Sequence, residues 1–370
     1  MRVIQHRIAL AAAAAGLSGL AAAAVAIAPA AQAQSGAGTP VTIASTVPGN
    51  GDVNPYGVAV VPRTEGKLKA GDVLVSNFNN SKNQQGTGTT IVQISPGGKQ
   101  TLFAQVNAKH LPGACPGGVG LTTALSILNH GWVVVGSLPT TAGDPATSKA
   151  GCLLVLNNRG KVVETFHGHG INGPWDMTAA NFGNAAALFV TNVLNGTVAA
   201  GGKQVHRGTV ERLVVTTPAH GAPRLLASTV IGSGFAEKTD PAALVIGPTG
   251  VGLARNGTLY VADTLGNRIA AIPNALFRHF SDGTGRTVTK GGALNGPLGL
   301  AVARDGDVLT VNSGDGNLVA TTPRGHQVAV ITLDKSGSPP GAGALFGLAI
   351  APHGGVYFVD DATNTLDLLP

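Results

Sequence analysis

The sequence predicts an all-β fold, a six-bladed β-propeller whose blades are four-stranded antiparallel sheets. A short phrase recurs six times along the chain, and each copy opens a unit of short β-rich runs, four per complete unit. The last unit is one run short at its end, while one extra run stands ahead of the first unit. Single blades cannot bury both of their faces, so we expect these units to stack around a closed ring.

The composition excludes disordered and collagen-like chains. The 370 residues are 44% hydrophobic and only 11% charged, whereas a disordered chain combines low hydrophobicity with high charge. The 54 glycines keep no three-residue period, which a collagen triple helix requires. Lysine and arginine are scattered, so the formal net charge of +6 indicates no basic patch and no nucleic-acid partner.

The first residues have the pattern of a secretory signal peptide. Arg2 and Arg7 precede an apolar stretch over residues 8–31, and Ala31-Gln32-Ala33 fits a cleavage site. The stretch is also long enough for a membrane anchor, but its glycines and its proline favour cleavage. We therefore expect a signal peptide over residues 1–33 and one propeller domain over residues 34–370, with no membrane span in the mature chain. The mature protein is then secreted, periplasmic or part of the cell envelope.

The chain contains two cysteines, Cys115 and Cys152. In an oxidising compartment such a pair favours a disulfide, with free buried thiols as the alternative. Two thiols without further soft ligands make a poor zinc site.

The first β-rich runs of the six units share one phrase. Its copies are NPYGVAVV from Asn54, CPGGVGLT from Cys115, NGPWDMTA from Asn172, GPTGVGLA from Gly247, NGPLGLAV from Asn295 and ALFGLAIA from Ala344. Five copies share a glycine at one position, namely Gly57, Gly118, Gly250, Gly299 and Gly347, and the third copy has Asp176 there. In five copies a proline stands two residues before this position: Pro55, Pro116, Pro174, Pro248 and Pro297.

Each phrase is followed by further runs that complete a blade. The second run ends in a polar residue, as in TLYVAD, and the third and fourth runs are of the type CLLVLN and KVVETFH. Asn256-Gly257 and Asp305-Gly306 stand between consecutive runs, where tight hairpin turns need residues that tolerate positive φ. The sixth unit ends after its third run, and VTIASTV over residues 41–47 resembles a fourth run. We expect this segment to complete the last blade and close the ring.

The pattern is clearest in PTGVGLARNGTLYVADTLGNRI over residues 248–269, which resembles the NHL-repeat family. The resemblance extends over nearly the whole mature chain and implies a six-bladed β-propeller. This fold hosts binding modules, scaffolds, lyases and lactonases alike, so the resemblance does not imply one function.

Polar residues that end the second runs should share a face with the loops before the first runs. This circle consists of Asn77, Asn192, Asp263, Asn312 and Asp360, with Ser137 in the sixth place. Oxygen ligands around an axis suit calcium or another divalent metal. Alternatively, each residue caps its own turn through a local hydrogen bond.

The third unit departs from the repeat. Asp176 replaces the usual glycine, Trp175 stands beside it, and His167 and His169 precede both. The histidines and the carboxylate could bind a metal or a ligand, or act as acid and base, but a His-x-His pair on a glycine-rich loop is also ordinary polar surface. Trp175 provides either a flat wall for a ligand or packing between blades.

An insertion over residues 231–243 falls on the same face and contains Phe235, Glu237 and Asp240. It forms either a pocket rim or lid, or a solvated loop.

The sequence lacks the GxSxG, HExxH, phosphate-loop and complete calcium-hand motifs. We therefore expect an exported, monomeric propeller that binds a small molecule or an extracellular protein on its loop face. The alternative is a metal-dependent lyase or lactonase with a site at the propeller axis, using His167, His169 and Asp176. The sequence leaves open whether the protein is an enzyme.

Overall fold

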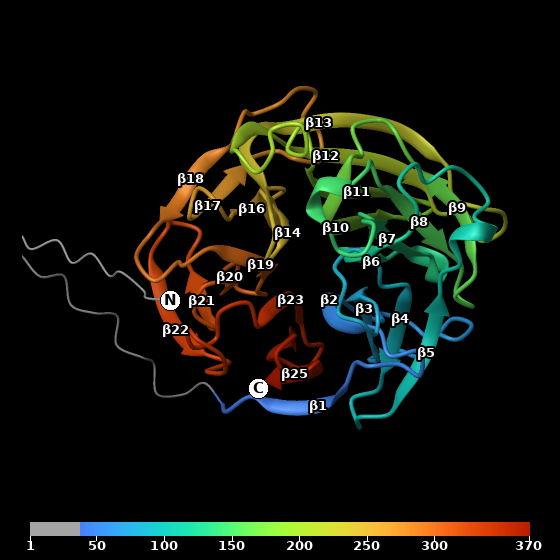
Figure 1. Ribbon diagram of the computed structural model, residues 1–370, viewed down its shortest axis with the longest axis horizontal. Helices are drawn as coiled ribbons and strands as arrows, with labels where there is room; N and C mark the ends of the chain where they lie inside the picture. The colour runs from blue at the N-terminus through green and yellow to red at the C-terminus, as the bar shows by residue number, and fades with distance from the viewer. Residues whose placement is uncertain (1–37) are drawn as a thin grey trace, which may run out of the picture.

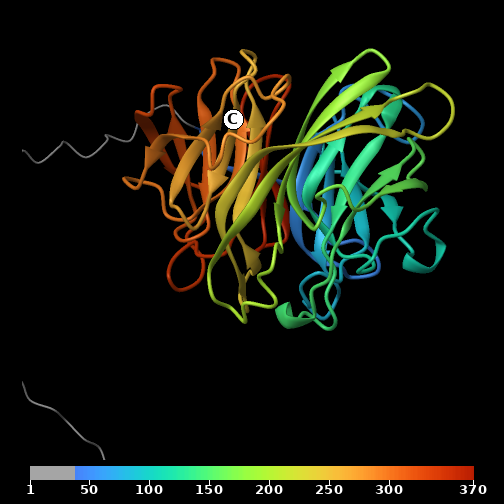
Figure 2. The same ribbon diagram turned by 90° about the horizontal axis from the view of Figure 1, so that it is seen from above.

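A computed structural model describes residues 38–370, in which six antiparallel sheets form a ring around a central axis (Figure 1). The strands run between the two faces of this disc (Figure 2). The predicted all-β, six-bladed propeller is therefore confirmed. The expected signal peptide over residues 1–33 lies outside the described residues.

The blades are numbered here by the order of their inner strands. Blade 1 contains β2 (Val53–Val60), β3 (Val73–Asn79), β4 (Thr90–Ile94) and β5 (Gln100–Gln105). Blade 2 contains β6 (Leu121–Ile127), β7 (Val133–Ser137), β8 (Cys152–Leu156) and β9 (Val162–Phe166). Blade 3 contains β10 (Gly173–Phe182), β11 (Ala185–Val193), β12 (Val205–Thr216), β13 (Leu225–Asp240) and a short fifth strand, β14 (Leu244–Ile246).

The remaining blades are more regular. Blade 4 contains β15 (Pro248–Leu253), β16 (Leu259–Asp263), β17 (Arg268–Ile272) and β18 (Arg286–Lys290). Blade 5 contains β19 (Pro297–Val302), β20 (Val308–Asn312), β21 (Asn317–Thr321) and β22 (Gln327–Thr332). Blade 6 contains β23 (Leu345–Ile350), β24 (Val356–Asp360), β25 (Thr365–Leu369) and β1 (Val41–Ser45). Three short 3-10 helices lie in loops: η1 (Ala108–His110), η2 (Asn129–Gly131) and η3 (Pro145–Thr147).

The amino-terminal strand closes the ring as predicted. β1 pairs antiparallel with β25, with Val41 opposite Leu368 (Figure 1). The Thr42 hydroxyl donates a hydrogen bond to Asp367 Oδ1 at 2.6 Å. Because the first described strand completes the last blade, the two ends of the described chain are joined by strand pairing within one sheet.

Hydrophobic clusters fill the boundaries between blades. One cluster joins Phe103 and Ile91 of blade 1 to Leu125 and Leu154 of blade 2, and comparable clusters occupy the other five boundaries. A further cluster lies among the starts of the inner strands. The core is therefore divided among the blade boundaries, as stacked units require.

A bulge recurs at the start of every inner strand. Register shifts between Pro55 and Val58 in blade 1, and at the matching place in the other five blades. A Cβ atom added to Gly347, within this bulge, would overlap the Tyr56 carbonyl oxygen of blade 1, and one on Gly299 would overlap the Phe346 carbonyl oxygen of blade 6. The repeated glycine is needed because neighbouring inner strands meet there backbone to backbone.

Blade 2 differs from the predicted repeat in where the recurring phrase lies relative to the inner strand. Pro116 and Gly118 precede β6, and Leu121 occupies the position opposite Ser137 that proline holds in four other blades. The segment containing Pro116 lies against the start of β8, because the Gly117 N–H donates to the Ala150 carbonyl oxygen and Cys115 forms a disulfide with Cys152. The copy that begins at Cys115 therefore covers the preceding loop as well as the start of the strand.

The insertion over residues 231–243 is mostly strand rather than loop. β13 continues to Asp240 and pairs with β12, with Glu237 opposite Val205. The chain then turns, and β14 pairs with the end of β13. The Gln85 Nε2 group of blade 1 donates to the Ala242 carbonyl oxygen at 2.9 Å. This hydrogen bond joins the β13–β14 hairpin to blade 1, which is not a neighbour of blade 3 in the ring.

Substitution of Gly347 by alanine should destabilise the propeller by about 3 kcal/mol, because the added methyl group overlaps the backbone of blade 1. Gly49 is the matched control, since a Cβ there meets no atom within 4 Å. Urea denaturation followed by circular dichroism measures both variants. Equal midpoints for Gly347→Ala and Gly49→Ala would contradict the close approach of the inner strands.

Candidate functional site

A pocket of about 450 Å³ opens among the starts of the inner strands, on the face we call the loop face. Its lining comes from blades 1, 3, 4, 5 and 6 and from the β13–β14 hairpin. We call this cavity the loop-face pocket, and it is the candidate binding site. Its lining residues include Asn54, Tyr56, Asn79, Gln85, Trp175, Asp240, Phe346 and Asp361.

Aromatic side chains form the base of the loop-face pocket. The Tyr56 ring stacks on Phe346, with centroids 4.1 Å apart, and lies 4.5 Å from Phe78 and 6.0 Å from Trp175. Tyr56 and Trp175 are 5% and 6% exposed, so the rings pack closely and leave little surface. We call Tyr56, Phe78, Trp175 and Phe346 the aromatic layer. Trp175 thus lines the pocket and also packs between blades, as its two sequence interpretations proposed separately.

Sequence reasoning singled out Trp175 but missed Tyr56 and Phe346. All three occupy the position immediately before the glycine of the recurring phrase, or before Asp176 in the third copy. The residue at this position varies among the six copies, so it does not stand out as part of the repeat. The available signal was that four of the six copies have a large apolar side chain at this position: Tyr56, Trp175, Leu298 and Phe346.

One carboxylate at the pocket has no partner. Among residues 38–370, no hydrogen bond or ion pair is formed by the Asp361 carboxylate, which lines the pocket and is partly buried. Burial and the nearby Asp360 carboxylate raise the pKa of Asp361 to about 6. Asp240 on the opposite rim forms an ion pair with Lys238 at 3.1 Å and accepts a hydrogen bond from the Ala242 N–H. Asp361 is therefore the carboxylate that a ligand could engage without breaking another contact.

Three amides around the pocket present unsatisfied acceptors. The side-chain oxygens of Asn54, Asn79 and Gln85 are buried and accept no hydrogen bond. Two of the amide nitrogens are already committed, because Asn79 donates to Asn83 Oδ1 at 2.6 Å and Gln85 donates to Ala242. Unpaired buried acceptors are costly, but these oxygens are closed to solvent, so a ligand would reach them only if the side chains turned toward the pocket.

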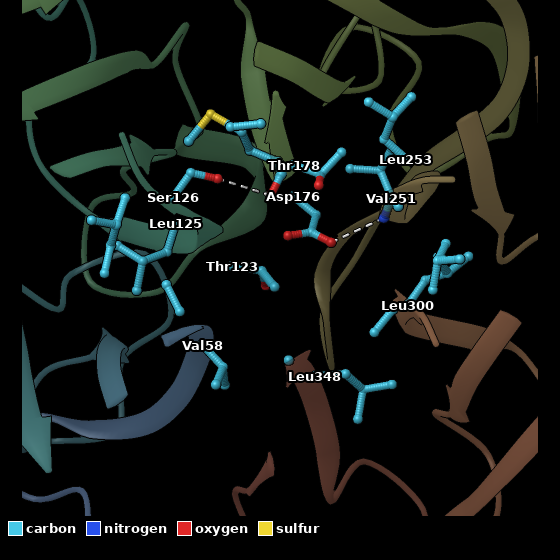
Figure 3. Close-up of a pocket in the computed structure, with 18 residues that line it drawn as sticks. Val58, Thr123, Leu125, Ser126, Asp176, Thr178, Val251, Leu253, Leu300 and Leu348 are labelled. Atoms are coloured by element: carbon cyan, nitrogen blue, oxygen red, sulfur yellow. Dashed lines mark hydrogen bonds between the residues drawn. The ribbon is translucent and has the colours of Figure 1, made fainter. Parts of the chain in front are cut away.

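A second cavity, the axial channel, lies beyond the aromatic layer. It measures about 290 Å³ and is lined by the inner strands of all six blades (Figure 3). A gap of only about 10 Å³ lies within the layer, bordered by Tyr56 and Trp175 of the pocket and by Thr123 of the channel. The aromatic layer thus separates the pocket from the channel.

Asp176 belongs to the axial channel. Its Oδ2 atom accepts a hydrogen bond from the Val251 N–H of blade 4 at 3.0 Å, and its carboxylate faces the channel (Figure 3). Its own N–H donates to Thr191 Oγ1 at 3.0 Å. Burial raises the pKa of Asp176 to about 7. The residue that replaces glycine here joins two blades and places an ionisable group in the channel.

The structure does not bring His167 and His169 to either cavity. Both side chains are exposed, in the loop between β9 and β10, and Ser228 of β13 donates to the His169 carbonyl oxygen. Among residues 38–370, no three His, Cys, Asp or Glu side chains gather as a set that could hold a metal. A role for these histidines with Asp176 stays a prediction, without support from their placement.

Phe235 and Glu237 are fully buried and do not line the loop-face pocket. Phe235 packs in the core between blades 3 and 4. Glu237 Oε1 accepts a hydrogen bond from the Asn195 N–H at 3.0 Å, and burial raises the pKa of Glu237 to about 7. Of the candidates in the insertion, only Asp240 reaches the pocket, so the end of the hairpin provides its rim.

The polar residues that end the second strands are all buried, and each forms at least one hydrogen bond. Asp263 accepts from Gly266 and Arg268, Asn312 donates to Ala293, Ser137 donates to Gly118, Asp360 accepts from Thr363, Asn192 accepts from Asn172, and Asn77 donates to Thr46. The contacts of Asp263 and Asp360 lie within their own turns and support the turn-capping alternative for these two residues. The cited contacts of the other four residues reach segments 19 to 31 residues away along the chain. The oxygens of Asn77 and Asn312 accept no hydrogen bond, so metal binding by the circle stays a prediction, which elemental analysis would test.

The loop-face pocket itself is a poor match for an axial metal. The side chains that meet at its base are Tyr56, Trp175, Leu298 and Phe346, whereas calcium requires about six to eight oxygen ligands.

The predicted disulfide between Cys115 and Cys152 is confirmed, with Cα atoms 5.2 Å apart. It indicates an oxidising compartment. Within residues 38–370, no helix is long and apolar enough to cross a membrane.

Comparison with solved structures shows the fold. A luciferin-regenerating enzyme matches with a TM-score of 0.53 and 10% identity over 89% of this chain and 95% of that chain. A gluconolactonase from Xanthomonas campestris matches with a TM-score of 0.52 and 14% identity over 90% of this chain and 89% of that chain. No protein-family model matches the chain, and no curated protein matches it. At these identities the similarity establishes the shared fold and not an activity.

Buried carboxylates should make stability depend on pH. The pKa values of Asp176 and Glu237 are both raised to about 7 in the folded chain, and unfolded carboxyl groups titrate near about 4. Between these pH values the folded chain binds more protons than the unfolded chain. The free energy of unfolding should therefore fall as pH rises from about 4 to about 7.

Asp176→Asn should test the contribution of the axial carboxylate. Asparagine can still accept the Val251 N–H but carries no charge, so we expect a gain of about 1 to 3 kcal/mol at pH 8 and no gain at pH 4. Urea denaturation at both pH values measures the difference. A loss of stability at pH 8 would show that the charged form is favoured in the folded protein.

Proposed function

We propose that the protein is an exported NHL-type propeller that binds a small molecule in the loop-face pocket. The observation that carries this proposal is a pocket with an aromatic base, a wall of polar side chains and one unpartnered carboxylate. Ligand sites combine an apolar lining with a few polar groups that converge on the ligand. An oxidising compartment, indicated by the disulfide, supports export.

A small molecule suits the pocket better than a protein surface does. The base lies among the inner strands, and the β13–β14 hairpin and the blade 1 loop containing Gln85 border the opening. A volume of about 450 Å³ is within the range of small-molecule sites. We therefore place the function in this cavity, with the protein acting as a monomer.

The alternative proposal, a metal-dependent lyase or lactonase, has weaker support. Its expected histidines are exposed, Asp176 lies across the aromatic layer in the channel, and the pocket base is apolar. The similarity in fold to a gluconolactonase is compatible with it but adds no active-site residues.

Trp175 allows binding to be followed directly. The chain has two tryptophans, and Trp132 lies in the core between blades 2 and 3, so Trp132→Phe leaves a single fluorophore beside the pocket. We expect some members of a library of aromatic amines, alcohols and acids to change the Trp175 emission saturably. Calorimetry on the unmodified protein checks the same compounds.

Ala342→Phe should weaken this binding at least about tenfold, because Ala342 is an exposed residue of the pocket wall. Ala146→Phe is the matched control, since Ala146 is also exposed but lies outside the pocket. If no compound of any class binds, or if both variants bind equally well, the pocket is not the functional site.

A further inference from the structure

We propose that the ligand of the loop-face pocket is a small organic cation, an ammonium group attached to an apolar or aromatic body. This inference rests on the proposed function, because it names the chemical class of ligand for the same pocket. It follows from the charge, the hydrogen-bonding groups and the aromatic surface that the pocket presents.

The pocket is acidic in a basic protein. The chain has 24 lysines and arginines against 18 aspartates and glutamates, yet no lysine, arginine or histidine lines the pocket, whereas Asp240 and Asp361 do. Lys238 neutralises Asp240 through their ion pair, but no basic side chain pairs with Asp361 among the described residues. The local charge therefore favours a cation and opposes an anion.

The hydrogen-bonding groups point to the same class. The side-chain oxygens of Asn54, Asn79 and Gln85 lack donors but are buried, while the Asn79 and Gln85 nitrogens already donate to protein atoms. The partly exposed acceptor of the pocket is the Asp361 carboxylate. An ammonium group has donors and no acceptor, so it matches the Asp361 carboxylate, which accepts hydrogen bonds and has no partner among the described residues. The oxygens of a carboxylate or phosphate ligand are acceptors, so they would face the acceptor oxygens of Asp361 with no donor between them.

The aromatic layer suits the remaining part of such a ligand. Tyr56, Trp175 and Phe346 give an apolar base for a hydrocarbon or aromatic body, and ring faces attract cations held near them. Burial and the negative charge of Asp361 raise the pKa of Tyr56, so its hydroxyl stays neutral. A sugar would also stack on the rings, but its neutral hydroxyl groups would leave the charge of Asp361 without a counter-ion.

Three probes with one aromatic body test the inference: phenethylamine, 2-phenylethanol and phenylacetate, measured at pH 7.5 by calorimetry and by Trp175 emission in the Trp132→Phe protein. We expect the amine to bind at least about tenfold more tightly than the alcohol, and phenylacetate to bind most weakly. Tighter or equal binding of the alcohol or the acid overturns the cation inference while leaving the binding proposal intact. Absence of binding by all three, and by the larger library, defeats both.

Asp361→Asn separates charge from shape. The variant should bind phenethylamine about tenfold more weakly and 2-phenylethanol within about twofold of the parent. Asp305→Asn, which removes a carboxylate outside the pocket, should change neither affinity. An unchanged amine affinity in Asp361→Asn would overturn the assignment of this carboxylate as the ammonium partner, and melting temperatures confirm that both variants are folded.

Discussion

The contact between neighbouring inner strands is the constraint on which the rest of the structure depends. At the bulge that opens each blade, the backbone of one strand meets the backbone of the next, and Gly299 and Gly347 leave no room for a side chain. Hydroxyl groups strengthen some of these contacts, since Ser76 accepts from the Gly57 N–H and donates to the Thr122 carbonyl oxygen of blade 2. This close approach brings the residues beside the glycines together near the axis.

The aromatic layer follows from that geometry and divides the axis into two environments. Above it, the loop-face pocket combines ring surfaces with acceptors and an unpaired carboxylate. Below it, the axial channel contains Asp176 among the inner strands. Because the layer is closely packed, a ligand in the pocket would not share a cavity with Asp176. The two carboxylates that sequence and structure draw attention to, Asp176 and Asp361, therefore serve different cavities.

Blade 3 carries most of the departures from the repeat, and it also contributes most to the two cavities. It supplies Trp175 to the aromatic layer and Asp176 to the channel, and its extended outer strand turns into β14 at the rim of the pocket. A regular blade packs only against its neighbours, whereas the β13–β14 hairpin also contacts blade 1 through Gln85. The irregular features of this blade are thus the ones that shape the site.

The sequence by itself determined the blade architecture, because strand runs, turns and the recurring phrase are local patterns. It also identified the closing strand at residues 41–47 and the cysteine pair. The tertiary structure decided the register of blade 2, where the disulfide-linked loop separates Pro116 from β6, and it buried Phe235 and Glu237 within paired strands. It also decided the pocket. Tyr56 and Phe346 stand near opposite ends of the described chain, and they stack only because ring closure places blade 6 against blade 1.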